Sequence, residues 1–299
     1  MRAPEEHLAS DVGTSNEGAY RLRACWVLAL LWLPLFLTSA FMQGSSAGVG
    51  LWAAQLILLF VIALLHSSLL YGWLGTCCYV VIGLVVAIAF EASSISFGFP
   101  YGSYVHHSPG PRLLQVPLQA AFLYLVYGWY AWTLARLLCL DRPVQMSVGA
   151  RFLVPLCGGF ILAGYDYPID PIMSSVAGLW TFAEPRGQFG VPLTNFLGWI
   201  LTGWAIFQPL VFLERRFFAT PRSRGKSYWL LPSVIWLGQA VQFVIMWSHA
   251  PAGEVNPGGR SFVISDVYEA GVAASLFTVV FVGLLGIARL RRDTESRDV

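Results

Sequence analysis

Repeated apolar runs dominate the sequence, and each is long enough to cross a lipid bilayer as a helix. About 20 predominantly apolar residues span the hydrocarbon core, and such runs occur at about 24–42, 50–71, 74–92, 114–138, 148–166, 192–213, 228–248 and 267–288. Hydrophobic residues make up 57% of the chain and charged residues 11%, whereas soluble domains carry roughly 25% charged residues. The sequence therefore predicts an all-α, polytopic membrane helix bundle with about eight transmembrane helices.

The basic residues indicate how this bundle is oriented. Cytoplasmic loops are enriched in Lys and Arg, and with the N-terminus inside, only Arg112, Arg186 and Arg260 of the 18 basic residues fall on the outer side. Removing one span from the topology would mix the basic residues of the inner side with those of the outer side. The distribution of basic residues therefore supports both the span count and two cytoplasmic termini. A formal net charge of +2 gives no basic field for nucleic acid. We expect a multi-pass protein of the cell membrane.

The remaining segments define the domain organisation. Residues 1–20 are polar and mixed in charge, which predicts a disordered cytoplasmic tail. We expect residues 21–290 to form a single transmembrane domain, the catalytic one if the chain is an enzyme, and 291–299 to form a second cytoplasmic tail. The apolar piece at 171–180 is too short to span and predicts an interfacial or re-entrant helix. The five cysteines lie in apolar runs without a metal or disulfide spacing.

Three acids are expected at membrane depth, at the outer end of the bundle. Glu91 ends the third apolar run, Asp166 ends the fifth, and Asp170 follows closely. An ionisable residue in a membrane helix costs roughly 2.5–3.5 kcal/mol, which marks these acids as candidate functional groups. Structural roles remain open: Asp170 before Pro171 resembles a helix N-cap, Asp166 could be solvated, and Glu91 could reach the interface.

Other polar side chains are expected near these acids. Gln115 and Gln119 are predicted to share one face of the fourth span, and Asn195 opens the sixth span. Such amides either join helices by hydrogen bonds or bind a substrate. His106 and His107 lie in an outer loop, but adjacent side chains point apart, so no metal site is predicted.

The outer segments are also rich in aromatic residues, which allows two interpretations. One is an ordinary interfacial belt. The other is a pocket whose rings lie beside carboxylic acids. Desolvation keeps an acid protonated and ring faces stabilise a cation, so such a pocket suits carbocation chemistry on an apolar isoprenoid. The candidate pocket rings are Tyr101, Tyr104, Tyr165, Trp180, Phe196 and Trp199.

Several short motifs in this region together resemble a known family. They are FGFPYGSY at 97–104, VPL at 116–118, DYPIDP at 166–171, Trp180, and FGVPLTNFLGW at 189–199. Their order and spacing resemble the CruF-type carotenoid 1,2-hydratases, which are membrane carotenoid biosynthesis proteins. The similarity covers roughly residues 85–205, and the last two long blocks are the most specific.

The resemblance implies a hydro-lyase that adds water across the terminal 1,2 (isopropylidene) double bond of an acyclic carotenoid end group, giving a tertiary alcohol. The substrate would be lycopene-like or γ-carotene-like, without a cofactor or metal, and the partners would be the lipid bilayer and other carotenoid pathway enzymes. On this hypothesis Asp166, kept neutral by apolar surroundings, protonates the alkene. Glu91 or Asp170 then accepts a proton from water that Asn195 positions.

Two other functions remain open from the residues alone. A membrane prenyltransferase would use the D-x-x-x-D spacing at 166–170 with Mg²⁺ and a diphosphate, although such enzymes have a second acidic motif and more basic residues nearby. A proton-coupled transporter would use Glu91 and Asp166 as a relay. The main polar residues expected at mid-membrane are Gln239 and Gln242, and no acid accompanies them in that run.

Overall fold

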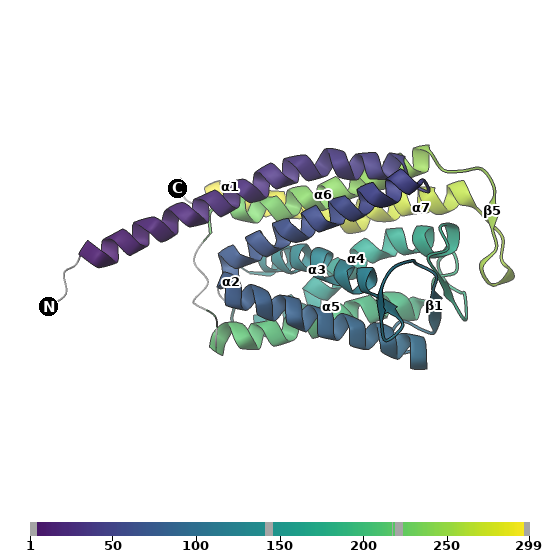
Figure 1. The fold of residues 1–299 in the computed structure, drawn as a ribbon, viewed down its shortest axis with the longest axis horizontal. Coiled ribbons are helices and arrows are strands. Elements are labelled where there is room, and N and C mark those ends of the chain that lie inside the picture. The colour runs from purple at the N-terminus through teal and green to yellow at the C-terminus, as the bar shows by residue number, and fades with distance from the viewer. Residues whose placement is uncertain (1–4, 141–145, 217, 219–223, 296–299) are drawn as a thin grey trace.

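The computed structural model describes residues 5–140, 146–216, 218 and 224–295, and it is a helix bundle (Figure 1). The α-helices are α1 (Glu5–Phe41), α2 (Ser46–Phe97), α3 (Leu118–Cys139), α4 (Ala150–Pro171), α5 (Leu193–Arg216), α6 (Lys226–Ser248), α7 (Ile264–Ser275) and α8 (Phe281–Glu295). Short π-helical or 3-10 segments are η1 (Ile172–Val176), η2 (Pro257–Gly259) and η3 (Leu276–Val280). The strands are β1 (Tyr104–His106), β2 (Arg112–Leu113), β3 (Val116–Pro117), β4 (Trp180–Phe182), β5 (Glu254–Val255) and β6 (Phe262–Val263).

The predicted membrane bundle is confirmed. Six helices among the described residues are long and apolar enough to cross a membrane. One of them, α2, contains two predicted spans, because the chain turns back at Gly72, whose φ of 68° and ψ of 177° suit glycine alone. Its two arms run in opposite directions (Figure 1). With these arms counted separately and α3 included, all eight predicted apolar segments are essentially helical.

The bundle has two different ends. At the terminal end, α1 begins and α8 finishes, whereas β1 and β5 lie at the opposite end, here called the loop end (Figure 1). Arg112, Arg186 and Arg260 lie in connections at the loop end, as the charge pattern predicts. The predicted cytoplasmic residues at 1–4, 141–145, 219–223 and 296–299 lie outside the described residues.

Three local features differ from the sequence-based expectations. Residues 5–20, expected to be a disordered tail, form the first part of α1, and α8 extends through 291–295 of the expected second tail. The short helix expected near 171–180 is η1, a π-helical turn that continues α4 directly and is followed by β4. The N-cap role of Asp170 is wrong, since Asp170 lies in the last turn of α4 rather than at a helix start.

Helix α3 is the centre of the bundle. Every residue from Tyr124 to Leu137 is buried, and α3 contacts α2, α4, α6 and α8 along its length. Beside it, α4 and α5 approach closely at two glycines. A Cβ at Gly159 would lie 2.4 Å from the carbonyl oxygen of Ile200, and one at Gly203 would lie 2.7 Å from the Cα of Gly159. Small residues permit such close helix packing in membranes, and here they fix α4 against α5 below the candidate site.

Candidate active site at the loop end

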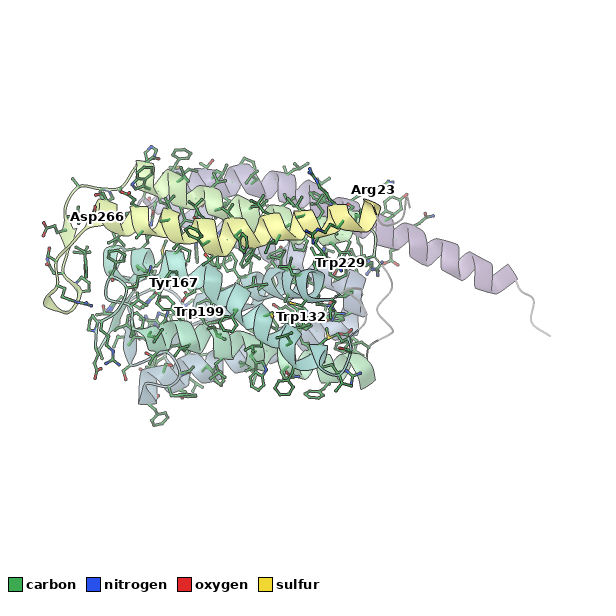
Figure 2. The ribbon with its side chains drawn as sticks, turned by 180° about the vertical axis from the view of Figure 1, so that it is seen from behind. Arg23, Trp132, Tyr167, Trp199, Trp229 and Asp266 are labelled. Atoms are coloured by element: carbon green, nitrogen blue, oxygen red, sulfur yellow. The ribbon has the colours of Figure 1, made fainter. Side chains whose placement is uncertain are left out.

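A cavity of about 50 Å³ lies at the loop end, between α2, α3, α4 and α5. This volume holds a few water molecules. Figure 2 shows Trp199, one of its lining residues, nearer to the loop-end residue Asp266 than Trp132 is. The lining residues are Glu91, Tyr101, Tyr104, His106, Ala120, Leu123, Tyr124, Asp166, Asp170, Trp180, Phe182, Asn195 and Trp199.

Two short strands close the cavity by simple β-strand alternation. β1 pairs antiparallel with β4, so that Tyr104 is opposite Phe182 and His106 is opposite Trp180. Directly opposed residues project to the same face of a ribbon, and all four of these side chains line the cavity. The intervening Val105 and Thr181 are exposed. The ribbon therefore presents four rings to the cavity and a small outer face to the surroundings.

Glu91 is the centre of the first polar cluster. It lies near the end of α2, is buried, and accepts hydrogen bonds from the Tyr104 hydroxyl and, at 3.0 Å, from the Tyr124 hydroxyl. His106 Nε2 lies 3.2 Å from Glu91 Oε2. Burial, together with the Glu91 carboxylate, raises the pKa of Tyr104 well above its usual range, so this phenol stays protonated and donates.

Asp166 and Asp170 form the second polar cluster. They lie one helical turn apart on α4, so their side chains share one face, and both are buried. The Asn195 amide, in the first turn of α5, donates to Asp166 Oδ2 at 3.0 Å and to Asp170 Oδ2 at 2.5 Å. Asp170 Oδ1 is also buried, and the Trp180 side chain is a polar neighbour of the same carboxyl. One amide thus holds two carboxyl groups at the cavity wall.

Stacked rings form the apolar part of the wall. Tyr124 stacks on Trp199 with ring centroids 4.3 Å apart, and Tyr101 lies beside Tyr124 at 6.3 Å. Tyr101 is held by its hydroxyl, 2.6 Å from Thr202 Oγ1, and its ring occupies the space left by Gly198, where a Cβ would lie 2.3 Å from Tyr101 Cδ1. The motif around Gly198 therefore serves close ring packing.

The structure brings most of the predicted site residues together and leaves four outside the cavity lining. Tyr165 points toward α6, where its hydroxyl lies 3.4 Å from Gln239 Oε1, and Phe196 packs against Tyr167. Gln115 is exposed in the turn between β2 and β3, with a φ of 68°. Gln119 is partly buried on α3. Because Gln115 precedes α3, the predicted shared helical face of the two glutamines is wrong.

Sequence reasoning missed two polar members of the cavity. His106 was set aside because adjacent histidines point apart, which they do: His107 is exposed and lies 2.9 Å from Thr181 Oγ1. The alternation of Tyr104, Val105 and His106 in a strand could have placed His106 beside Tyr104. Tyr124 lies in the middle of an aromatic helix and carries no local signal of its role.

These features define a multi-pass membrane protein with a buried acidic, ring-walled site at one end of its bundle. A family model described as carotenoid biosynthesis protein matches residues 51–257, which is more than half of the chain and includes every cavity residue. The chain therefore belongs to the carotenoid biosynthesis protein family. No curated protein and no solved structure gives a significant match.

Proposed function

We propose that this protein adds water across the terminal 1,2 double bond of an acyclic carotenoid end group, giving a tertiary alcohol. The observation that carries the proposal is the meeting of three buried acids, Glu91, Asp166 and Asp170, in one ring-walled cavity. Acid-catalysed hydration needs a proton donor, a sheltered cation and a proton acceptor. Membership in a carotenoid biosynthesis family supports an isoprenoid polyene as the substrate.

The Asp166–Asp170 pair supplies the proton. Two negative charges that share one amide donor repel each other strongly in a buried environment, so the pair retains one proton. Asn195 steadies the ionised partner. In the first step the O–H bond of the protonated carboxyl, assigned to Asp166, breaks and a C–H bond forms at C2, the less substituted alkene carbon. The alkene electron pair makes this bond and leaves C1 as a tertiary cation.

The ring walls shelter that cation. Tyr101, Tyr124 and Trp199 present a continuous stack beside the acids, and a cation above an aromatic face is stabilised by about 0.5–2 kcal/mol. The nearby carboxylates add electrostatic attraction. The stack also limits the number of waters that reach the cation, which favours a single defined addition.

Water completes the reaction. Its oxygen forms the C1–O bond, and its proton passes to the Glu91 cluster. Tyr104 and Tyr124 hold Glu91 in position by hydrogen bonds. Its carboxylate can therefore stabilise the positive charge that this proton brings to the cluster. The sum of the two steps is addition of one water molecule, and solvent exchange returns the proton to the aspartate pair. No oxidation or reduction takes place.

The size of the cavity supports an end-group reaction. A volume of about 50 Å³ suits water and the terminal dimethyl-substituted carbon but not a polyene, so the rest of a lycopene-like or γ-carotene-like chain lies in the bilayer beside the helices. On the orientation indicated by the basic residues, the loop end faces the outer leaflet of the cell membrane. Other carotenoid pathway enzymes would supply the substrate within the same bilayer.

Expression in a bacterium that accumulates lycopene or γ-carotene tests this proposal. We expect pigments whose mass increases by one water per hydrated end. Asp166→Asn should abolish the product while the protein still accumulates, and Asp266→Asn, at an exposed position on α7, is the matched control. Absence of any hydrated pigment with both carotenoids would refute the proposal, and an active Asp166→Asn variant would refute the assignment of the acid.

A further inference from the structure

His106 is the basic side chain in the cavity wall. It ends β1, opposite Trp180, and its side chain is 6% exposed. The rings of Tyr104 and Trp180 pack edge-on against it, with centroids 5.1 and 5.9 Å away. The imidazole is therefore fixed in place by its neighbours on the ribbon, and its neighbour His107 points away from the cavity.

The two ring nitrogens of His106 have different surroundings. Nε2 lies 3.2 Å from Glu91 Oε2. In the tautomer of a neutral imidazole that donates from Nε2 to this carboxylate, Nδ1 carries the lone pair. Nδ1 is buried and has no hydrogen-bond partner among the described residues. Buried polar atoms are normally paired, so an unpaired acceptor in a cavity wall is suited to a ligand or a reacting water.

We infer that His106 Nδ1 is the base that takes the proton from the adding water, and that Glu91 is the positioning residue that orients the imidazole. This inference rests on the proposed hydration. The water oxygen forms the C1–O bond, its O–H bond breaks, and the proton goes to Nδ1. The resulting imidazolium is stabilised by Glu91 through the Nε2 hydrogen bond, the same arrangement by which a carboxylate orients a catalytic histidine elsewhere.

Glu91 itself is less suited to take this proton. Its two oxygens already accept from Tyr104, Tyr124 and His106. A proton on Glu91 would displace one of those donors, whereas Nδ1 has no hydrogen bond to lose among the described residues. The acid cluster on α4 and the base on β1 then come from different elements that meet only at the cavity.

Deuterium labelling separates the base from the acid. In D₂O, the aspartate pair delivers a deuteron to C2, and a cation that is not captured by water returns a proton from C2 to the pair. The recovered carotenoid then contains deuterium. His106→Gln keeps an amide donor toward Glu91 but cannot accept a proton. We expect it to lower hydration of lycopene at least about 100-fold while deuterium still enters the unhydrated pigment.

The controls make each result decisive. His107→Gln should match the wild type, and Asp166→Asn should lose both hydration and exchange. If His106→Gln hydrates within threefold of wild type, or loses exchange with an unchanged unfolding temperature, the inference is overturned. If that variant does not accumulate, Glu91→Gln, which keeps the imidazole, is judged by the same criteria. A wild-type protein that shows neither hydration nor exchange would instead overturn the proposed function.

Discussion

The two ends of the bundle bury charge in opposite ways. At the terminal end Arg136 is fully buried and makes a two-pronged ion pair with Glu214, at 2.7 and 3.1 Å. The Tyr71 hydroxyl joins this pair, and it also accepts from the Trp132 indole at 2.7 Å. Here a cation and an anion neutralise each other, and the arrangement ties α3 to α2 and α5.

The loop end gathers acids without such compensation. Within the part of the chain that the structure describes, the cavity lining contains no Arg or Lys, and the basic neighbour of the acids there is the His106 imidazole, whose Nε2 lies 3.2 Å from Glu91 Oε2. His106 Nδ1 is buried and has no hydrogen-bond partner among the described residues. The terminal-end charges thus neutralise each other within the fold, whereas the loop-end acids have the environment that the proposed proton transfer requires.

The largest effect is expected at the aspartate pair. Asp166→Asn and Asp170→Asn should each lower the hydration rate by about 10²–10⁴-fold, because a positioned acid contributes that much. The double variant should be no worse than the worse single one, since the two carboxyls act as a unit. Product mass per amount of folded protein gives the measurement. If the rate loss of the double variant equals the product of the two single losses, the two carboxyls do not share one proton.

Breaking the Arg136–Glu214 pair at the terminal end should lower the stability of the protein rather than its hydration rate. Arg136→Met leaves Glu214 buried without its partner, and removing one member of a buried pair destabilises by about 3–5 kcal/mol. Adding Glu214→Leu should recover most of the lost unfolding temperature in detergent. Hydration per folded molecule should stay near the wild-type value in both. A variant with the wild-type unfolding temperature but no hydration activity would contradict the proposed difference between the two ends.

Overfilling the cavity wall should reduce both stability and activity moderately. A Cβ introduced by Gly198→Ala would meet the Tyr101 ring at 2.3 Å, and overpacking of this kind costs about 1–3 kcal/mol. Gly50→Ala, on an α2 surface with nothing within 4 Å, is the control. The unfolding temperature and the amount of hydrated product should both fall for Gly198→Ala and not for the control. An unaffected variant would show that the ring stack is not needed.

Removing one donor to Glu91 should have a smaller effect. Tyr124→Phe deletes the 3.0 Å hydrogen bond to Oε1, and a bond to a charged group contributes about 1.5–3 kcal/mol, so we expect hydration to fall by roughly ten- to a hundredfold. Tyr130→Phe, which removes a hydroxyl bonded to the Leu59 carbonyl on the interior of the bundle, should keep full activity per folded molecule. If Tyr124→Phe and Tyr130→Phe lost hydration activity equally, the loss would reflect packing of the bundle and not the hydrogen bond to Glu91.

The smallest effect is expected at the glutamines outside the cavity lining. Gln119→Ala should change the hydration rate by less than about twofold, because this partly buried side chain does not line the cavity and substitutions away from such a site act weakly. The rate in membranes containing lycopene is the relevant measurement. A large loss would extend the site along α3 beyond the present cavity.

The sequence predicts the membrane bundle well and the site only in part. Apolar runs and basic residues indicate whether each segment lies in lipid or in water. The spans, including the two arms of α2 around Gly72, can therefore be predicted from them. The acids at the end of the third and fifth spans also follow, because charges in a membrane are rare. Both aspartates were predicted at the site, but Pro171 suggested a helix start at Asp170, whereas α4 continues through Pro171 and puts the two carboxyls on one helical face.

The remaining site residues depend on contacts that no local pattern reports. His106 reaches Glu91 because β1 pairs with β4, a segment more than 70 residues later. Tyr124 reaches the same carboxylate because α3 lies in the centre of the bundle. The spacing of Gln115 and Gln119 predicts a shared helical face, but α3 begins at Leu118, so Gln115 lies outside the helix. Long-range pairing and helix boundaries therefore account for the errors.

The most direct test of the central claim is the source of the oxygen atom. Purified protein in lipid vesicles, supplied with lycopene in H₂¹⁸O, should give a tertiary alcohol that carries one ¹⁸O atom at each hydrated end, and no added oxygen when Asp166 is replaced by asparagine. A product with unlabelled oxygen, or a modified carotenoid that has gained no water, would contradict acid-catalysed hydration at the loop end.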